Sequence, residues 1–335
     1  MKVLFIFTGG TIGSSAKGAY IGTDDQKPYL LLEAYRQKYG MDFEYETVAP
    51  YTALSENSTG RTLGALMACV DTYKNRAYDG IVVTHGTDTL QYSAAALSYA
   101  FADCKIPILL VSSNRPIEDP EANGLDNLRG ALRFIAEVKT PGVFVAYRNR
   151  GESVKLHRGT RLLESPAFCD GVFSIFDSHY GAFCEGMPFM RNEDDHASAD
   201  ELPAMGAVSL GESCPHILRV LPYPGNPYGE VPKGVQYILH GSYHSGTVNT
   251  ASPDVRAYFE RAARAGITTF LTGVENGISY ESTREFAALS ICPIYGIAPI
   301  AAFVKLWMWT AANEGQTATA ALLQRSLAGD VVKKQ

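Results

Sequence analysis

Two short segments rich in glycine and threonine carry residue types that suit hydrolytic chemistry. The first, Thr8–Gly13, reads Thr-Gly-Gly-Thr-Ile-Gly, and the second, Thr84–Leu90, reads Thr-His-Gly-Thr-Asp-Thr-Leu. Splitting an amide requires an activated hydroxyl together with donors for the oxyanion, and glycines at a strand end leave backbone N–H groups open toward a ligand. Thr11 and Thr87 are therefore candidate nucleophiles, and Asp88 is a candidate acid–base group.

Each segment also has an ordinary structural interpretation. A glycine-rich turn after a strand can hold a phosphate, although the GxGxxG and GxxxxGK[ST] patterns of such turns are absent. Asp88 and Thr89 can equally form the N-terminal cap of a helix that starts at Leu90. The functional interpretation therefore depends on the two segments meeting in one crevice.

Both segments follow apolar runs that are typical of parallel strands covered on both faces. Segments with helical spacing, at about 60–73, 90–102 and 125–138, alternate with these runs. This alternation predicts a doubly wound α/β sheet, whose ligand site lies beyond the carboxyl ends of the strands. The predicted strands are Val3–Phe7, Ile81–Thr84, Ile106–Val111 and Val143–Tyr147.

The second part of the chain predicts a smaller α/β domain. Residues 190–215 are polar with weak periodicity and are typical of a linker, which divides the chain into domains 1–190 and 216–335 with 191–215 between them. Ser252 and Pro253 favour a helix start, and Gly266 favours its end. The remaining predicted elements are strands Val235–Leu239 and Ile267–Leu271, a helix from about Pro299, and a last helix over 317–328.

Composition excludes several classes of protein. The 335 residues carry a net charge of −6 with scattered basic residues, so neither nucleic acid nor a membrane is expected as a partner. No apolar run reaches the roughly 18 residues of a membrane span. Six cysteines without a CxxC pair favour buried free thiols in a reducing compartment, with no zinc site. The first apolar run is too short for a signal peptide, so the protein is expected in the cytoplasm.

The two threonine segments, in this order and separation, resemble the TGGTI and HGTDT signatures of the bacterial-type L-asparaginase family. The resemblance covers nearly the whole chain. It implies two α/β domains, the larger one N-terminal, with an active site at their junction that a neighbouring subunit completes, as in a homodimer or homotetramer. It also implies hydrolysis of the side-chain amide of asparagine, and sometimes of glutamine, through a threonine nucleophile and an acyl-enzyme, with no metal and no cofactor.

The resemblance assigns roles by position. Thr11 matches the nucleophile, Tyr20 the tyrosine that activates it from a closing lid, and Thr87 with Asp88 the pair that places the water and the α-amino group of the substrate. Ser55 matches the serine that holds the α-carboxylate, with Ser58 as the alternative because a one-residue gap is needed. The remaining substrate-binding residues that the resemblance implies are Glu56, Gly86 and Ser113.

One position departs from the family pattern. The segment His157–Arg161 resembles the family's stretch before a catalytic lysine, and the lysine register then falls on Glu164. Three explanations stay open. Glu164 acts as a general base that shares a proton with Asp88, another cation such as Arg161 or Arg115 takes the place of the lysine, or the chain only binds an amino acid.

Loops of the second part offer weaker candidates. His240 and His244 are four residues apart, but no third ligand is spaced to complete a metal site with them. Glu275, at another predicted strand end, is a candidate for the acid that reaches into a partner's pocket in this family.

The sequence thus favours a cytoplasmic, homo-oligomeric L-asparaginase that releases aspartate and ammonia. A non-catalytic or weakly active amino-acid-binding relative is one alternative. The amidase subunit of a tRNA-dependent amidotransferase is the other, and it is less favoured because that class carries a further N-terminal domain, for which a first motif at Thr8 is expected to leave no room.

Overall fold

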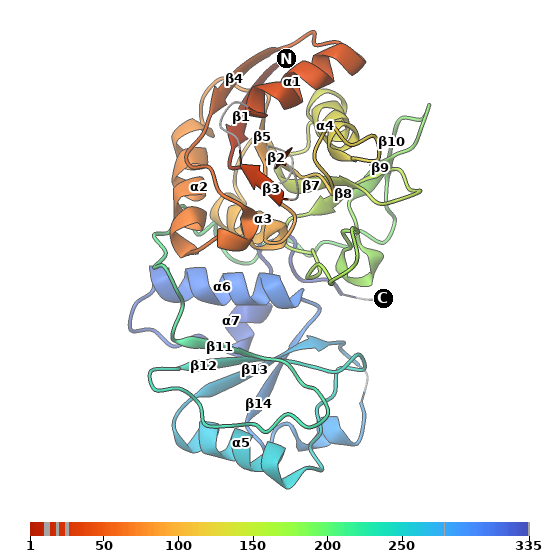
Figure 1. The fold of residues 1–335 in the computed structure, drawn as a ribbon. Coiled ribbons are helices and arrows are strands. Elements are labelled where there is room, and N and C mark those ends of the chain that lie inside the picture. Colours follow the sequence, from red (N-terminus) through yellow and green to blue (C-terminus); the bar gives the residue numbers. More distant parts are fainter. Residues whose placement is uncertain (10–13, 18–19, 24–26, 278, 334–335) are drawn as a thin grey trace.

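The chain forms two lobes, each built around its own sheet (Figure 1). The computed structural model describes residues 1–9, 14–17, 20–23, 27–277 and 279–333, and it describes side chains for 1–9 and from residue 30 onward. Among the described residues, the sheet of the N-terminal lobe has eight strands and that of the C-terminal lobe has four. This arrangement confirms the predicted fold class of a larger N-terminal mixed sheet with a smaller α/β domain.

The large sheet has the strand order β10-β9-β8-β7-β6-β5-β1-β4. Strands β4, β1, β5, β6 and β7 run parallel, and the three strands beyond β7 are antiparallel to their neighbours. The four predicted strands of this sheet are confirmed, with ends that differ by at most one residue. The bounds are β1 Lys2–Phe7, β4 Glu44–Val48, β5 Gly80–Thr84, β6 Pro107–Val111, β7 Gly142–Arg148, β8 Val154–Arg158, β9 Gly181–Phe183 and β10 Phe189–Arg191.

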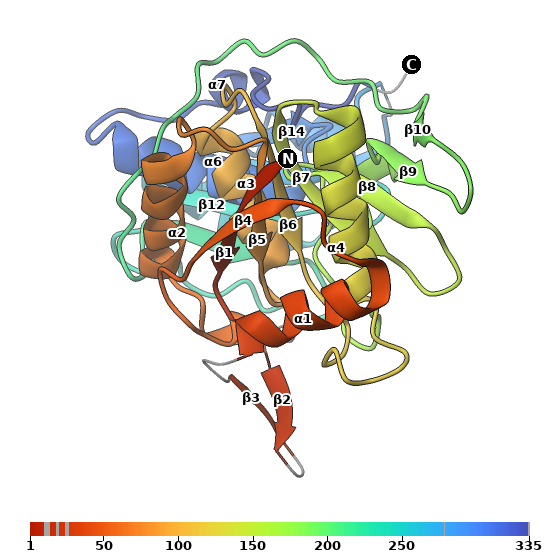
Figure 2. The ribbon, with the colours of Figure 1, turned by 90° about the horizontal axis from the view of Figure 1, so that it is seen from above.

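Helices cover both faces of this sheet because alternate residues of its buried strands point to opposite sides (Figure 2). Leu4 and Ile6 of β1 pack with α2 and α3, whereas Val3 and Phe5 pack with α1 and α4. The bounds are α1 Lys27–Tyr39, α2 Gly60–Tyr73, α3 Leu90–Ala100 and α4 Gly124–Arg133, with a π-helical turn η3 at Phe134–Val138 and 3₁₀ turns η2 at Ser55–Asn57 and η4 at Ile175–Asp177.

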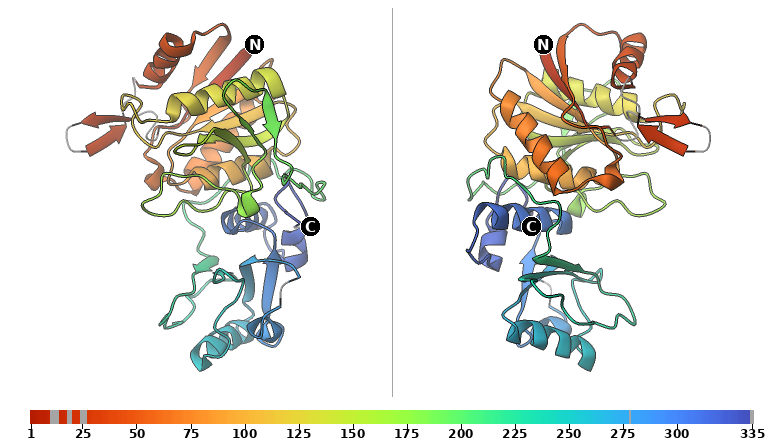
Figure 3. Two further views of the ribbon diagram at one scale, coloured as in Figure 1. Left: turned by 90° about the vertical axis from the view of Figure 1, so that its right-hand side faces the viewer. Right: turned by 60° about the vertical axis from the view of Figure 1, so that its left-hand side comes forward.

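The small sheet is parallel, in the order β11-β12-β13-β14. Helix α5 covers one face, and α6 lies between the two lobes, where it packs against α3 (Figure 3). The predicted last helix over 317–328 is wrong in extent, since only Ala320–Gln324 is helical. The bounds are β11 Ile217–Val220, β12 Tyr237–Gly241, α5 Pro253–Arg264, β13 Thr268–Val274, η5 Ser282–Glu285, β14 Ile291–Tyr295, α6 Pro299–Ala312 and α7 Ala320–Gln324.

Two further features bear on the site. Strands β2 (Ser14–Lys17) and β3 (Tyr20–Thr23) pair as an antiparallel hairpin that projects from the N-terminal lobe (Figure 2). The predicted linker runs from β10 toward β11 and contacts α3, where the Met205 amide donates to the Tyr99 carbonyl at 2.9 Å. Within the described part of the chain, every helix is too short or too polar to cross a lipid bilayer.

The six cysteines are all free thiols, but their surroundings differ from the expectation of general burial. Cys104 is buried, Cys169 is exposed, and the other four are half-buried. The expectation is wrong for Cys169 because it lies in a surface loop, where a local sequence pattern does not reveal exposure.

Candidate functional site

The ends of β1 and β5 lie side by side, which brings the two threonine segments to one edge of the sheet. Phe7 pairs with Thr84 in parallel register, and the Thr8 hydroxyl donates to the Thr84 carbonyl at 2.7 Å. Gly9 has φ +97°, and a Cβ there would lie 2.4 Å from the carbonyl oxygen of Ala53, so the turn requires glycine. Thr11 itself lies outside the described residues.

Ser55 joins the second threonine segment through its side chain and its backbone. Its hydroxyl lies 3.0 Å from Oδ2 of Asp88, to which it donates, and 3.3 Å from the Asp88 amide. The Thr89 hydroxyl contacts the Ser55 carbonyl at 3.0 Å and the Ser58 hydroxyl at 3.1 Å. Both serines of the predicted substrate loop therefore touch this segment, although Ser55 alone reaches the carboxylate. Glu56, between them, is exposed.

A cavity of about 330 Å³ opens beside the second threonine segment. Thr87 and Asp88 line one side, and a loop of residues 165–172 lines the other. Tyr147 and Asn149 fasten this loop to the end of β7, because the Tyr147 hydroxyl donates to the Asp170 carbonyl at 2.7 Å and the Asn149 side chain bonds both backbone groups of Val172. The geometry thus gives the cavity a fixed far wall.

The predicted Ser113 loop also borders the cavity. Ser113 is buried and its hydroxyl donates to the Arg115 carbonyl, whereas Asn114 lines the cavity. Asn114 and Asn123 each accept the other's backbone N–H with a side-chain oxygen, at 2.9 and 3.0 Å. The loop is therefore held at the start of α4, next to the end of β6.

His85 is a positioning residue that sequence reasoning left unassigned. Its Nδ1 lies 2.8 Å from the Gly86 carbonyl, and its Nε2 lies 2.8 Å from the Ser93 hydroxyl. Burial lowers the pKa of His85, so the ring is neutral, with Nδ1–H donating to Gly86 and Nε2 accepting from Ser93. The ring thereby holds the turn that contains Thr87 against the first turn of α3.

Glu164 pairs with an arginine of the C-terminal lobe. Its Oε2 lies 3.1 Å from Nη2 of Arg219, and Nη1 of the same arginine donates to the Tyr92 hydroxyl at 2.7 Å. The Asp88 carboxylate, by contrast, accepts from Ser55. The two acids have different partners, so their contacts do not support the sharing of a proton between them.

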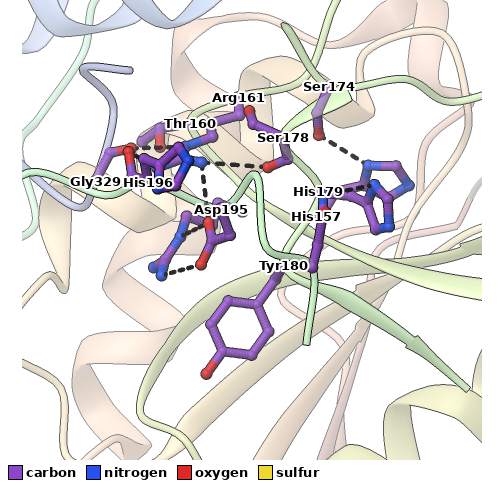
Figure 4. Close-up of polar contacts among 12 residues, drawn as sticks. His157, Thr160, Arg161, Ser174, Ser178, His179, Tyr180, Asp195, His196 and Gly329 are labelled. Atoms are coloured by element: carbon purple, nitrogen blue, oxygen red, sulfur yellow. Dashed lines mark hydrogen bonds and ion pairs between the residues drawn. The ribbon is translucent and has the colours of Figure 1, made fainter. Parts of the chain in front are cut away.

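The two arginines considered as replacements for the lysine are bound elsewhere. The guanidinium of Arg161 is fully buried and contacts Asp195 at 2.9 Å and the Gly329 and Ser178 carbonyls (Figure 4). Burial lowers the pKa of Arg161 to about 10. Arg115 pairs with Asp119 and Glu121 at 3.2 and 2.8 Å. Neither arginine lines the cavity.

The C-terminal candidates lie apart from this cavity. His240 is buried and bonded to the Tyr228 hydroxyl, and burial lowers its pKa to about 4. No group of three or more metal-ligating side chains occurs among the described residues. Glu275 lines a separate cavity of about 440 Å³, together with Phe176 and Tyr295.

A family model described as "Asparaginase, N-terminal" matches residues 2–169 of the chain. This chain belongs to the asparaginase family. The matched region contains the cavity-lining residues from Thr87 to Cys169 as well as Ser55 and Glu164, whereas Asp170, Val172 and Arg219 lie beyond it.

Relatives that resemble this chain carry two different names. The L-asparaginase of Thermococcus kodakarensis is 36% identical over 168 residues, which span 48% of this chain and 47% of that protein. The matched segment is thus about half the length of that relative. A glutamyl-tRNA(Gln) amidotransferase subunit from Pyrobaculum aerophilum is 26% identical over 327 residues, 93% of this chain and 75% of that protein.

Solved structures of the asparaginase family share the whole fold. A thermostable L-asparaginase from Thermococcus kodakarensis superposes with a TM-score of 0.79 at 22% identity, with complete coverage of both chains. A probable cytoplasmic L-asparaginase from Campylobacter jejuni gives a TM-score of 0.70 at 19% identity and covers 96% of this chain and 98% of its own.

Sequence reasoning located one wall of the site and missed the other. The threonine segments and the Ser55 turn stand out because glycine and hydroxyl residues follow buried strands. Tyr147, Asp170 and Arg219 carry no such local signal, because their roles depend on which loops meet after folding. Tyr20 lies in β3 and pairs with Lys17 in the backbone, while its side chain lies outside the described part.

Proposed function

We propose that this chain is an L-asparaginase-type amidohydrolase, which hydrolyses the side-chain amide of L-asparagine to L-aspartate and ammonia. The observation that carries the proposal is that Thr87 and Asp88, just after the strand β5 that pairs with β1, line a cavity while the Asp88 carboxylate accepts from the Ser55 hydroxyl. A volume of about 330 Å³ suits an amino acid, which is at the small end of the ligands that protein pockets enclose.

In the proposed reaction, the Thr11 hydroxyl attacks the side-chain amide carbon while Tyr20, on the hairpin and in its phenolate form, accepts the hydroxyl proton and later passes it to the leaving nitrogen. The C–N bond breaks as the nitrogen takes up a proton, and ammonia leaves an ester between the aspartyl group and Thr11. A water molecule placed by Thr87 then attacks this ester, which releases aspartate and restores the hydroxyl. Backbone N–H groups of the glycine turn are the proposed donors to the oxyanion.

The charges of the cavity fit the two ends of an amino acid. Asp88 and Asp170 line it and favour an ammonium group, with Asp88 proposed as its direct partner. The Ser55 hydroxyl already donates to Asp88, which fixes the carboxylate in one orientation. The Ser55 turn is proposed to receive the α-carboxylate. Further substrate-binding residues are proposed to be Ser58, Gly86, Glu56 and Ser113.

The proposal includes the setting of the enzyme. No metal or cofactor is required by this chemistry, because the nucleophile, the base and the oxyanion donors all belong to the protein. We further propose a homodimer or homotetramer in the cytoplasm, acting on a small amino acid, with neither nucleic acid nor a membrane as partner. The similarity in fold to the probable cytoplasmic L-asparaginase of Campylobacter jejuni supports that compartment.

A second candidate is the amidase subunit of a tRNA-dependent amidotransferase. The alignment with the amidotransferase subunit of Pyrobaculum aerophilum supports it, because that alignment covers 93% of this chain. Both candidates break a side-chain amide, but the amidotransferase passes the ammonia to a partner subunit. Activity without any partner distinguishes the two.

The test is steady-state ammonia release by the purified chain, with asparagine and glutamine as separate substrates, across pH 5 to 9. Wild type is expected to release ammonia from asparagine without a partner. Thr11→Val and Thr87→Val each remove a hydroxyl that the mechanism uses, and their turnover is expected to fall by about 10³ or more.

The matched control is Thr72→Val, which removes the hydroxyl of an exposed threonine on α2 that bonds only the Ala68 carbonyl. Its turnover is expected to equal that of wild type. Unchanged ammonia release in Thr87→Val contradicts the role of that residue. Binding of asparagine, detected as a raised melting temperature, without turnover at any pH contradicts the enzyme and favours an amino-acid-binding protein.

A further inference from the structure

The carboxylate of Glu164, at the register that the sequence predicts for the family's lysine, is part of a bridge between the two lobes. Arg219, on β11 of the C-terminal lobe, contacts both oxygens of Glu164, at 3.1 and 3.5 Å. The same guanidinium donates to the Tyr92 hydroxyl at 2.7 Å and lies 5.8 Å from the centre of the Phe303 ring. Arg219 therefore has an acid, a phenol and an aromatic ring as simultaneous partners.

This bridge lies directly behind two walls of the cavity. Glu164 immediately precedes Ser165, which lines the cavity as the first residue of the loop 165–172. Tyr92 lies in the first turn of α3, four residues after Asp88, and its amide donates to the Thr89 carbonyl. Arg219 thus connects the far wall of the cavity with the helix that presents the threonine segment.

The acidic side chains at and beside the cavity explain why a cation is needed next to Glu164. Asp88 and Asp170 already line the cavity, and the substrate brings a carboxylate of its own. An unpaired Glu164 would add further negative charge and oppose the binding of an anionic group. Pairing with Arg219 offsets the charge of Glu164 and keeps a guanidinium beside the same region.

Arg219 is suited to carry a permanent charge. Burial acts to lower the pKa of Arg219, but the hydrogen bond to Glu164 and the contact with Tyr92 outweigh burial and raise the pKa above its ordinary value. The guanidinium therefore stays protonated at every pH at which the protein is folded, unlike a lysine, which loses its proton in alkaline solution.

We propose that Arg219 is a positioning residue that supplies, from the C-terminal lobe, the positive charge which the asparaginase family places on the lysine at the register of Glu164. This inference rests on the proposed amidohydrolase function. Glu164 is then the anchor of the arginine, not the general base of the reaction.

The experiment compares turnover of asparagine in wild type, Arg219→Gln, Glu164→Lys and the double variant Glu164→Lys/Arg219→Gln. Arg219→Gln is expected to lower kcat at least tenfold. A lysine at position 164 restores the charge at the family's register, so the double variant is expected to recover to within threefold of wild type. Its activity should also decline on the alkaline side as the lysine loses its proton, whereas wild type keeps its charge.

Arg256→Gln is the matched control, because Arg256 pairs with Glu285 at 3.0 Å in the same lobe with comparable exposure. Its turnover is expected to equal that of wild type, and melting temperatures of all variants verify folding. Turnover of Arg219→Gln within twofold of wild type overturns the inference, as does failure of the double variant to recover while it remains folded. If wild type releases no ammonia from either amide, the proposed function fails first and the inference falls with it.

Discussion

Two arginine–carboxylate clusters lie at either end of the segment Arg158–Glu164, and they differ in burial. At the first, the carboxylate of Asp195 is fully buried and contacts Arg158, Arg161 and Arg191 at 2.7 to 2.9 Å. At the second, Glu164 is 50% exposed and pairs with Arg219, which is 26% exposed. Arginine–carboxylate pairs therefore occur in two different dielectric surroundings at the two ends of this segment.

The difference in burial distinguishes a charge cluster that stabilises the fold from an ion pair that contributes little to stability. The Asp195 cluster joins β8, the strand end at β10 and the Gly329 carbonyl (Figure 4), and none of its residues lines the cavity. Breaking it leaves a buried arginine unpaired, which costs several kcal/mol. A half-exposed pair contributes little to stability, since water screens it. The Glu164–Arg219 pair therefore has little structural reason to exist.

The largest effect on stability is expected at the buried cluster. Asp195→Asn removes the single carboxylate that three arginines share, so the free energy of unfolding is expected to fall by about 3–5 kcal/mol. Urea denaturation measures this as a lower midpoint with an unchanged slope. Asp194→Asn, at the exposed neighbour, is the control and is expected to change the midpoint little. A loss below about 1 kcal/mol in Asp195→Asn would remove the distinction between the clusters.

The next largest effect on stability depends on pH and comes from another buried side chain, that of His157. His157 is buried, its Nδ1 contacts Ser174 at 2.9 Å, and burial together with His179 and Lys155 lowers its pKa to about 3. The unfolded chain binds this proton below about pH 6.5, whereas the folded chain resists it, so stability is present above pH 6.5 and is lost as pH falls. One such histidine is expected to cost about 2 kcal/mol between pH 7 and pH 5.

Unfolding free energies at pH 7 and pH 5 measure this loss. His157→Gln keeps a hydrogen-bonding group for Ser174 but has no proton to gain, so its stability is expected to depend less on pH by that amount. His244→Gln, at an exposed loop position, serves as the control. An equal pH dependence in wild type and His157→Gln is the outcome that excludes this explanation.

The sequence predicted what is local and missed what depends on contacts between distant residues. Strands β5 and β6 were predictable because every residue in them is apolar or small and buried. The antiparallel strand β8 was missed because it carries the charged residues Lys155 and Arg158, and β9 and β10 were missed because each is only three residues long. Asp88 was found through its motif, and its partner Ser55, 33 positions away, was found only through the family resemblance.

The same limit explains why the sequence did not reveal the partner of Glu164. The register of the segment after β8 identified the position, but its partner Arg219 lies 55 residues further along, in a strand with no motif of its own. The choice between general base and ion pair is not encoded in the spacing around residue 164. It arises from how α6 and β11 dock on α3 and bring Tyr92, Phe303 and Arg219 together.

The smallest effect on stability is expected at this second cluster. Glu164→Gln, Arg219→Gln and the double variant complete a double-mutant cycle, whose coupling energy in urea unfolding is expected to stay below about 1 kcal/mol because Glu164 is half exposed. A coupling above about 2 kcal/mol would mean that the pair holds the lobes together, as Asp195 holds its arginines. A weak coupling energy together with a large loss of turnover in Arg219→Gln would instead indicate that this arginine serves the reaction. The pair would then contribute much to turnover and little to the free energy of unfolding.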